Sequence, residues 1–191
     1  MVKFYFLLIV SFILMAGCKT VKKETDVSNS KYEVNIGEPE IIDQPETDFS
    51  EQSTWLLGYF PKSRMSGEPH SEWFMKGYDS YAPDNEVINQ LNTIAKDILT
   101  IKIVLGTWCP DSRREVPRFM RIIDLWQFPA EKITFIGVDN AKLSPIGEYT
   151  SLSIERVPTF IIYKNNIEAG RIIENPTTSL EQDIVNILKN E

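Results

Sequence analysis

The side chain best suited to chemistry in this sequence is the thiol of Cys109. An apolar run, Ile101 to Leu105, precedes it and a helical pattern follows it, so Cys109 falls where a strand passes into a helix. Backbone N–H groups at the start of a helix are unpaired, and together with the helix dipole they stabilise a thiolate. The sequence therefore predicts a nucleophilic thiol that attacks disulfides or thiol adducts of other proteins.

Ser112 occupies the position at which a dithiol redox site has its second cysteine. Serine cannot replace sulfur in exchange, because the reaction passes through a sulfur–sulfur bond that a thiolate attacks. We expect Ser112 to donate a hydrogen bond to the Cys109 thiolate instead. An adduct on Cys109 then needs another thiol to resolve it. The alternative is that Cys109 is no longer used and that the domain only binds its partners.

The second half of the sequence alternates between strand and helix patterns. The run Ile133 to Val138 is apolar apart from Thr134, as is typical of a strand covered on both faces. Asp84 can cap a helix that extends to about Leu99. The elements predicted after it are strands over 101–106, 133–138, 157–163 and 168–173, and helices over 110–126, around 146–150 and over 179–189. This order predicts an α/β fold with a central mixed sheet flanked by helices.

Five large side chains further upstream are expected to serve packing. Residues 63–71 include Gly67 and Pro69, which are typical of a loop. Aromatic and methionine side chains crowd the positions that follow, and such side chains usually pack beneath a loop. These side chains are Trp73, Phe74, Met75, Tyr78 and Tyr81.

Several separate features resemble the thioredoxin superfamily. Trp108 precedes Cys109, and Pro117 lies eight positions after the cysteine, where the helix-kinking proline of that family lies. The Val-Pro-Thr sequence at 157–159 is similar to the cis-proline turn of the family. The resemblance covers roughly residues 85–191, and it implies a thioredoxin-like fold and thiol-disulfide exchange.

Glu115 and Pro117 together narrow the resemblance to the membrane-tethered, extracytoplasmic thioredoxins of the TlpA and ResA type. Two positions depart from the family pattern. The resolving cysteine is Ser112, and the buried acid that many thioredoxins place six residues before the nucleophile is Ile103. A monothiol site therefore lacks both the second sulfur and the group that can help to take its proton.

The resemblance also implies roles for the residues around the sulfur. Trp108 would shield one side of the thiol, or only plug the edge of the sheet. Val157 would present its backbone carbonyl and amide to an extended substrate segment, with Pro158 in the cis form. Glu115 would act as an acid or base beside the sulfur, or lie on the exposed face of its helix. The predicted catalytic residues are Cys109, Ser112 and Glu115, and the predicted substrate-binding residues are Trp108, Pro110, Val157 and Pro158.

The N-terminus is typical of a secretory signal. Lys3 precedes a nearly uninterrupted apolar run, residues 4–15, which is short for a membrane span. The small residues Ala16 and Gly17 come directly before Cys18. This pattern resembles the lipobox of bacterial lipoproteins, which implies that Cys18 is lipidated and becomes the first residue of the mature chain. The alternative is an ordinary secretory signal in which the cysteine is a coincidence, and both predict an extracytoplasmic protein.

Three segments follow from these patterns: a lipoprotein signal peptide over 1–17, a flexible tether over 18–53 and a thioredoxin-like domain over 54–191. The tether is predicted from its charged and polar composition. As a flexible coil of about 30 residues, it reaches on the order of 30 Å from the bilayer. The alternative is that Tyr32 to Ile42 adds an edge strand to the domain.

The composition excludes some classes of function. The chain has 191 residues, a formal net charge of −7 and no basic stripe, which argues against binding nucleic acid. We expect no cofactor and no metal site because His70 is the only histidine, although copper held by His70, Cys109 and a methionine is an alternative. A lipidated Cys18 would leave Cys109 as the single free thiol, so no internal disulfide could form. The predicted partners are protein disulfides or thiols and the membrane, and the protein is predicted to be a monomer.

Overall fold

The structure is a computed structural model that describes residues 47–189 of the chain. The predicted signal over 1–17, the predicted lipidation site Cys18 and the alternative strand over 32–42 lie outside the described residues. Within the described part, the helices are too short or too polar to cross a membrane.

A mixed five-stranded sheet forms the centre of the fold, in the strand order β1-β3-β2-β4-β5. β2 and β3 are parallel, whereas β1, β4 and β5 run antiparallel to their neighbours. The strands are β1 (Gly58–Phe60), β2 (Leu99–Leu105), β3 (Ile133–Gly137), β4 (Thr159–Lys164) and β5 (Ile167–Ile173). The predicted α/β class with a central mixed sheet is therefore confirmed.

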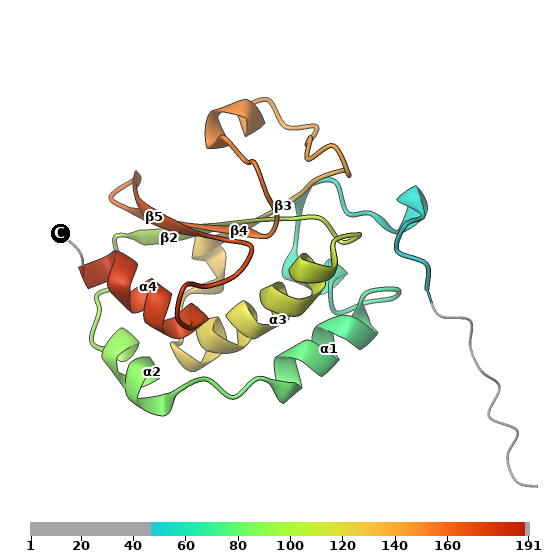
Figure 1. Cartoon of the computed structure of the whole chain (residues 1–191). Helices are drawn as coiled ribbons and strands as arrows, with labels where there is room; N and C mark the ends of the chain where they lie inside the picture. The colour runs from blue at the N-terminus through green and yellow to red at the C-terminus, as the bar shows by residue number, and fades with distance from the viewer. Residues whose placement is uncertain (1–46, 190–191) are drawn as a thin grey trace, which may run out of the picture. The chain divides into compact units, whose positions relative to one another are not determined.

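Four helices lie on one side of this sheet (Figure 1). They are α1 (Ser71–Ser80), α2 (Asn85–Asn92), α3 (Pro110–Leu125) and α4 (Leu180–Lys189). The connection between β3 and β4, residues 138–158, extends on the other side and contains a short 3-10 helix, Tyr149–Leu152. This 3-10 helix overlaps the short helix predicted around residues 146–150 and begins three residues later.

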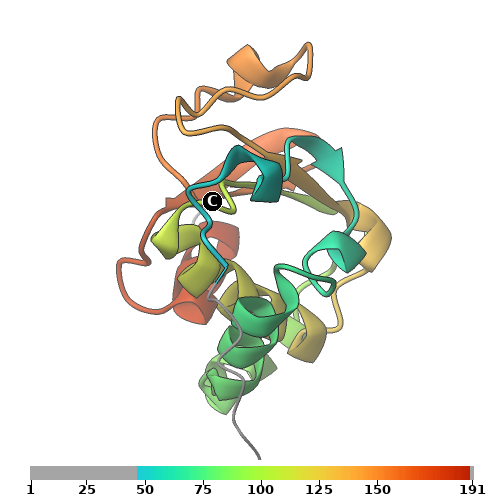
Figure 2. The same cartoon turned by 90° about the vertical axis from the view of Figure 1, so that its right-hand side faces the viewer.

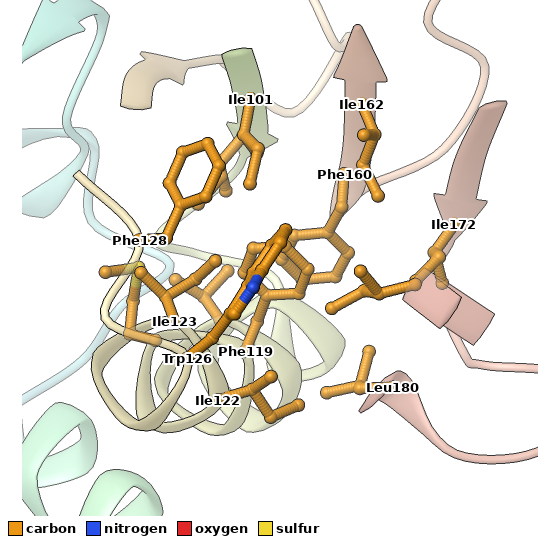
Figure 3. Packing of buried hydrophobic residues seen from close by; sticks show 14 of the residues in the cluster. Ile101, Phe119, Ile122, Ile123, Trp126, Phe128, Phe160, Ile162, Ile172 and Leu180 are labelled. Carbon is orange, nitrogen blue, oxygen red and sulfur yellow. The ribbon is translucent and has the colours of Figure 1, made fainter. Parts of the chain in front are cut away.

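The main core lies between the sheet and α3 (Figure 3). Phe119 of α3 stacks on Phe160 of β4 with ring centroids 4.2 Å apart, a geometry that aromatic pairs favour. Trp126, directly after α3, is fully buried, and its indole N–H donates to the Leu91 carbonyl oxygen at 2.7 Å. These contacts hold α3 against both the sheet and α2. They thereby hold the first turn of α3 in position relative to the sheet.

The helix capped by Asp84 is shorter than predicted. The cap itself is confirmed, since the Asp84 carboxylate accepts a hydrogen bond from the Glu86 backbone N–H at 2.7 Å. The helix ends at Asn92, however, and Leu99 is the first residue of β2. Leu99 is buried within the sheet, so strand pairing takes the apolar side chain that helical spacing had assigned to the helix.

The aromatic residues that were expected beneath a loop instead form α1. Phe74 and Tyr78 are one helical turn apart and stack with ring centroids 6.3 Å apart. Gly77 allows this helix to approach α3, because a Cβ at Gly77 would lie 2.6 Å from the ring of Pro117. The expected packing is confirmed for Phe74, which lies in the core, and for Trp73, Tyr78 and Tyr81, which pack against it, whereas Met75 is exposed. The helix was missed because large side chains fill residues 72–76, which obscures the buried face.

Gly137, the last residue of β3, has no space for a side chain. A Cβ at this position would lie 1.9 Å from the backbone carbonyl oxygen of Leu56. We predict that Gly137→Ala lowers the free energy of unfolding by about 3 kcal/mol or more, because the obstructing atom belongs to the backbone and cannot rotate away. Urea denaturation followed by circular dichroism measures this change.

Gly147→Ala is the matched control for that measurement. A Cβ at Gly147 meets no atom within 4 Å, so this substitution should change the free energy of unfolding by less than about 0.5 kcal/mol. Equal stabilities of the two variants would contradict the packing of β3 against the segment that leads into β1.

Candidate functional site

Cys109 lies at the junction of β2 and α3. It is the N-cap residue of α3, with an extended backbone. Its N–H donates to the Gly106 carbonyl oxygen at 2.9 Å, and its own carbonyl accepts the first helical bond from the Arg113 N–H at 3.0 Å. Pro110 follows at the first helical position, where a missing N–H costs no helical hydrogen bond. The thiol is therefore carried at the positive end of the α3 dipole.

The sulfur of Cys109 faces the turn before β4. Sγ donates a hydrogen bond to the Val157 carbonyl oxygen at 3.4 Å. The peptide bond between Val157 and Pro158 is cis, and both side chains are buried. The structure thus brings the predicted nucleophile together with two of the predicted substrate-binding residues, although they are 48 positions or more apart in the sequence.

Cys109 also belongs to a second apolar cluster, on the side of the sheet away from α3. Its side chain is only 7% exposed. The cluster combines three strand residues with four residues of the β3–β4 connection. The strand residues are Val104, Ile136 and Ile161, and those of the connection are Val138, Tyr149, Leu152 and Val157. A partner that reacts with the sulfur therefore has to approach through a narrow opening.

Trp108 is held in place at the end of the sheet. Its indole N–H donates to the Val138 carbonyl oxygen at 3.0 Å. The ring lies over Gly106, where a Cβ would be 2.5 Å from the indole. The side chain also packs against the apolar cluster that contains Cys109. The indole can therefore cover the region of the thiol and close the end of the sheet at the same time.

Ser112 ties the first turn of α3 to the end of β2. The side chain is fully buried, and its Oγ accepts a hydrogen bond from the Gly106 backbone N–H at 3.3 Å. Within residues 47–189 no hydrogen bond joins Ser112 to Cys109. Because the hydroxyl serves as an acceptor here, its hydrogen is left for the role that the sequence predicts toward a thiolate.

Glu115 is buried between arginines. Only 3% of it is exposed, so it does not lie on the exposed face of the helix. Its carboxylate contacts Arg114 Nε at 2.6 Å and an Arg118 terminal nitrogen at 3.2 Å. Within residues 47–189 no contact joins it to Cys109, and the two guanidinium groups balance its charge.

Arg113 is a residue of the site that was not among the predicted catalytic or substrate-binding residues. One terminal nitrogen donates to the carbonyl oxygens of Thr107 and Trp108, each at 3.1 Å. Burial lowers the pKa of Arg113, and a negative charge on Cys109 acts in the opposite direction. The sequence feature that could have identified Arg113 is its position four residues after Cys109, near the start of the predicted helix.

The end of the predicted tether contacts this site. Phe49 lies 4.6 Å beneath the guanidinium carbon of Arg113 and 5.7 Å from the ring of His70, and its carbonyl accepts a hydrogen bond from the Trp55 indole at 2.9 Å. Figure 2 shows this segment running beside the start of α3. Residues 47–53 therefore pack on the domain that was predicted to begin at residue 54.

His70 is buried away from the sulfur. Its ring packs between Phe49 and Trp73, and within residues 47–189 its Nδ1 has no hydrogen-bond partner. In the same range, no group of three or more His, Cys, Asp and Glu side chains is placed to hold a metal ion. Cys109 is a free cysteine.

Comparisons with known proteins give likenesses among solved structures. No protein-family model matches the sequence, and no curated protein matches it. A protein of unknown function from Pseudomonas aeruginosa is similar, with 15% identity and a TM-score of 0.42, over 62% of this chain and 78% of that chain. A thioredoxin from Trypanosoma brucei brucei is similar, with 28% identity and a TM-score of 0.34, over 59% of this chain and 95% of that chain.

The class of fold is defined by the architecture of the chain itself. A cysteine caps the helix that follows β2, β2 and β3 are parallel, and a cis-proline directly precedes the antiparallel strand β4. These features together make a thioredoxin-like fold, as the sequence predicted.

The environment of His70 predicts that acid destabilises the domain. Burial lowers the pKa of His70, the positive charges of Arg64 and Arg113 lower it further, and Glu68 acts in the opposite direction. The unfolded imidazole takes up a proton near its ordinary pKa of about 6.5, while the folded one takes it up only at a lower pH. The unfolded state therefore binds more protons, and the free energy of unfolding should fall as the pH drops below about 6.5, by at most about 1.4 kcal/mol per pH unit.

Urea denaturation between about pH 6.5 and pH 5 measures this slope, before most carboxylates titrate. His70→Phe keeps an aromatic ring between Phe49 and Trp73 and removes the titrating group. Because the sequence has no other histidine, this variant should lose the slope. An unchanged slope in the variant would refute the assignment to His70.

Proposed function

We propose that this protein exchanges thiols and disulfides of other proteins through Cys109, as a monothiol enzyme in an extracytoplasmic compartment. The observation that carries the proposal is the 3.4 Å contact between the Cys109 sulfur and the Val157 carbonyl, beside the cis bond to Pro158. This contact places the thiol of the N-cap residue of α3 against backbone that can pair with an extended chain. A substrate segment lying along this turn would present its own sulfur to Cys109.

The reaction follows from the groups at the site. The Cys109 thiolate attacks one sulfur of a partner disulfide, the sulfur–sulfur bond breaks, and the other sulfur leaves as a thiolate that takes a proton from water. The product is a mixed disulfide between Cys109 and the partner. Ser112 cannot attack this bond, so the adduct persists until an external thiol arrives. The attacking sulfur lies at the positive end of the α3 dipole, and within residues 47–189 Ser112 forms no hydrogen bond with it.

A second candidate function is that of a binding or chaperone-like module that uses the groove at Pro158 without redox chemistry. The burial of Cys109 favours it, since a sulfur that is 7% exposed and packed among apolar side chains also suits a purely structural role. Under this alternative the thiol is a packing group, and partners bind along the Val157 backbone whether or not sulfur is present.

Partner trapping distinguishes the two candidates. We predict that the native protein forms mixed disulfides with partner proteins, visible as adducts on gels that a reducing agent dissolves. Cys109→Ser should abolish these adducts. Ser112→Cys should deplete them at least about tenfold, because a second sulfur at this position can attack the adduct and release the partner. Mass spectrometry of the adducts identifies the partner cysteines.

The opposing outcome is equally specific. If Cys109→Ser captures the same partners as the native protein in a chemical cross-linking experiment, and no reducible adducts form, binding is the activity and exchange is not. The fold of each variant is checked by its circular dichroism and thermal unfolding.

The proposed location rests on the N-terminal sequence. The apolar run over 4–15 and the small residues before Cys18 support export and lipidation, and the anchor would hold the domain at a membrane surface. A lipidated Cys18 has its sulfur blocked in a thioether. It could not resolve adducts on Cys109, which agrees with the need for an external thiol.

Metabolic labelling with a fatty acid tests the anchor. In a bacterial host the native protein should incorporate the label and sediment with membranes, and Cys18→Ala should do neither. Cys109→Ser, which removes the other cysteine, is the matched control and should be labelled like the native protein. A native protein that is cleaved but not labelled would indicate an ordinary secretory signal.

A further inference from the structure

A hollow of about 540 Å³ lies beside Trp108, between residues 47–50 and the start of α3. Its walls include two indoles, those of Trp55 and Trp108, whose ring centroids are 6.3 Å apart. Two charged side chains, Asp48 and Arg113, also line it. Its volume is that of sites that hold small molecules.

The two charges in this hollow are not neutralised by neighbours. Within residues 47–189 Arg113 forms no ion pair, and its side-chain hydrogen bonds go to backbone carbonyls. The next residue, Arg114, differs, because it pairs with Asp111 at 2.8 Å and with Glu115 at 2.6 Å. Asp48 accepts a hydrogen bond from the Ser50 backbone N–H at 2.8 Å and likewise forms no ion pair within the described range. The hollow therefore offers one cation and one anion that do not satisfy each other.

Arg113 also lies close to the reactive sulfur along the chain. The Trp108 carbonyl that it holds at 3.1 Å belongs to the peptide group joined to Cys109. The same guanidinium is near enough to Cys109 for the charge of a thiolate to act on it. A ligand whose carboxylate meets Arg113 would thus lie next to the backbone turn that carries Cys109.

We propose that this hollow binds a small zwitterionic thiol, of the amino-acid or short-peptide class, which resolves the mixed disulfides of Cys109. The ligand carboxylate pairs with Arg113, its ammonium group pairs with Asp48, and its aliphatic part lies against the two indoles. This inference rests on the proposed exchange function and identifies the thiol that the chain itself lacks.

The step balances with the thiol as its only co-reactant. The thiolate of the ligand attacks the Cys109 sulfur of the mixed disulfide, the bond to the partner breaks, and the partner leaves as a thiolate that is protonated by water. A second molecule of the thiol attacks the ligand sulfur and releases the Cys109 thiolate. Two thiols are thereby oxidised to one symmetric disulfide for each adduct that is reduced.

Four small thiols of different charge test the proposal. The protein is first converted to its Cys109 adduct with 2,2′-dipyridyl disulfide, and the release of pyridine-2-thione by each thiol is followed by absorbance. The thiols are cysteine, 3-mercaptopropionate, cysteamine and 2-mercaptoethanol, which carry both charges, the carboxylate only, the ammonium only and neither. Each rate is divided by that for the pyridyl adduct of free N-acetylcysteine amide, which corrects for intrinsic reactivity.

We expect the normalised rate to be highest for cysteine. Arg113→Gln should lower it about threefold to fivefold for cysteine and 3-mercaptopropionate while leaving the other two thiols within about twofold. Asp48→Asn should lower it by a similar factor for cysteine and cysteamine only. Arg114→Gln is the matched control, since it removes the same charge from the same helical turn, and it should not change the order of the four thiols.

The results separate the two proposals. Equal normalised rates for all four thiols, or an Arg113→Gln effect that is the same for all of them, would overturn the ligand site while leaving exchange through Cys109 intact. A native protein that forms no pyridyl adduct although it is folded would overturn the exchange function itself.

Discussion

The position of Cys109 depends on the closed turn between β2 and α3, and Gly106 holds that turn together. Its N–H donates to the Ser112 hydroxyl, its carbonyl accepts from the Cys109 N–H, and the Trp108 ring occupies the space where a side chain would otherwise lie. Gly106 thus contacts Ser112, Cys109, the predicted nucleophile, and Trp108 at the same time. With α3 anchored at its far end by Trp126, the sulfur has little freedom to move relative to the turn before β4.

Much of this fold could be predicted from the sequence, because several signals are local. The mainly apolar runs that form β2 and β3 predict strands, and Asp84 predicts the start of a helix. The end of α2 could not be placed, since Leu99 suits a helix face and a strand equally and only pairing with β4 decides. At the site, the approach of Cys109 to Val157 followed from the family resemblance. The partners of Glu115 and the environment of Arg113 depend on long-range packing, which spacing along the chain does not reveal.

The two faces of the sheet serve the sulfur differently. On one face, the aromatic core around Phe119 makes α3 a rigid support. On the other, the β3–β4 connection adds Tyr149 and Leu152 to the small cluster that covers Cys109. A thiol that is covered in this way is protected from unselective oxidation, because susceptibility follows exposure as well as thiolate character. Under the proposed exchange function, the same cover restricts partners to those that can present a sulfur on an extended, narrow segment.

The Val157 carbonyl oxygen has a hydrogen-bond donor only while the Cys109 sulfur carries its hydrogen. The thiol of Cys109 donates to it at 3.4 Å, but neither a thiolate nor a sulfur in a disulfide has a proton to give. Loss of that proton leaves a buried acceptor unpaired, and a backbone N–H from an incoming chain is the natural replacement. The Val157 carbonyl oxygen therefore becomes available to an incoming chain when the neighbouring sulfur loses its proton. The binding of that chain and the chemistry of the sulfur are thus thermodynamically linked through a single oxygen atom.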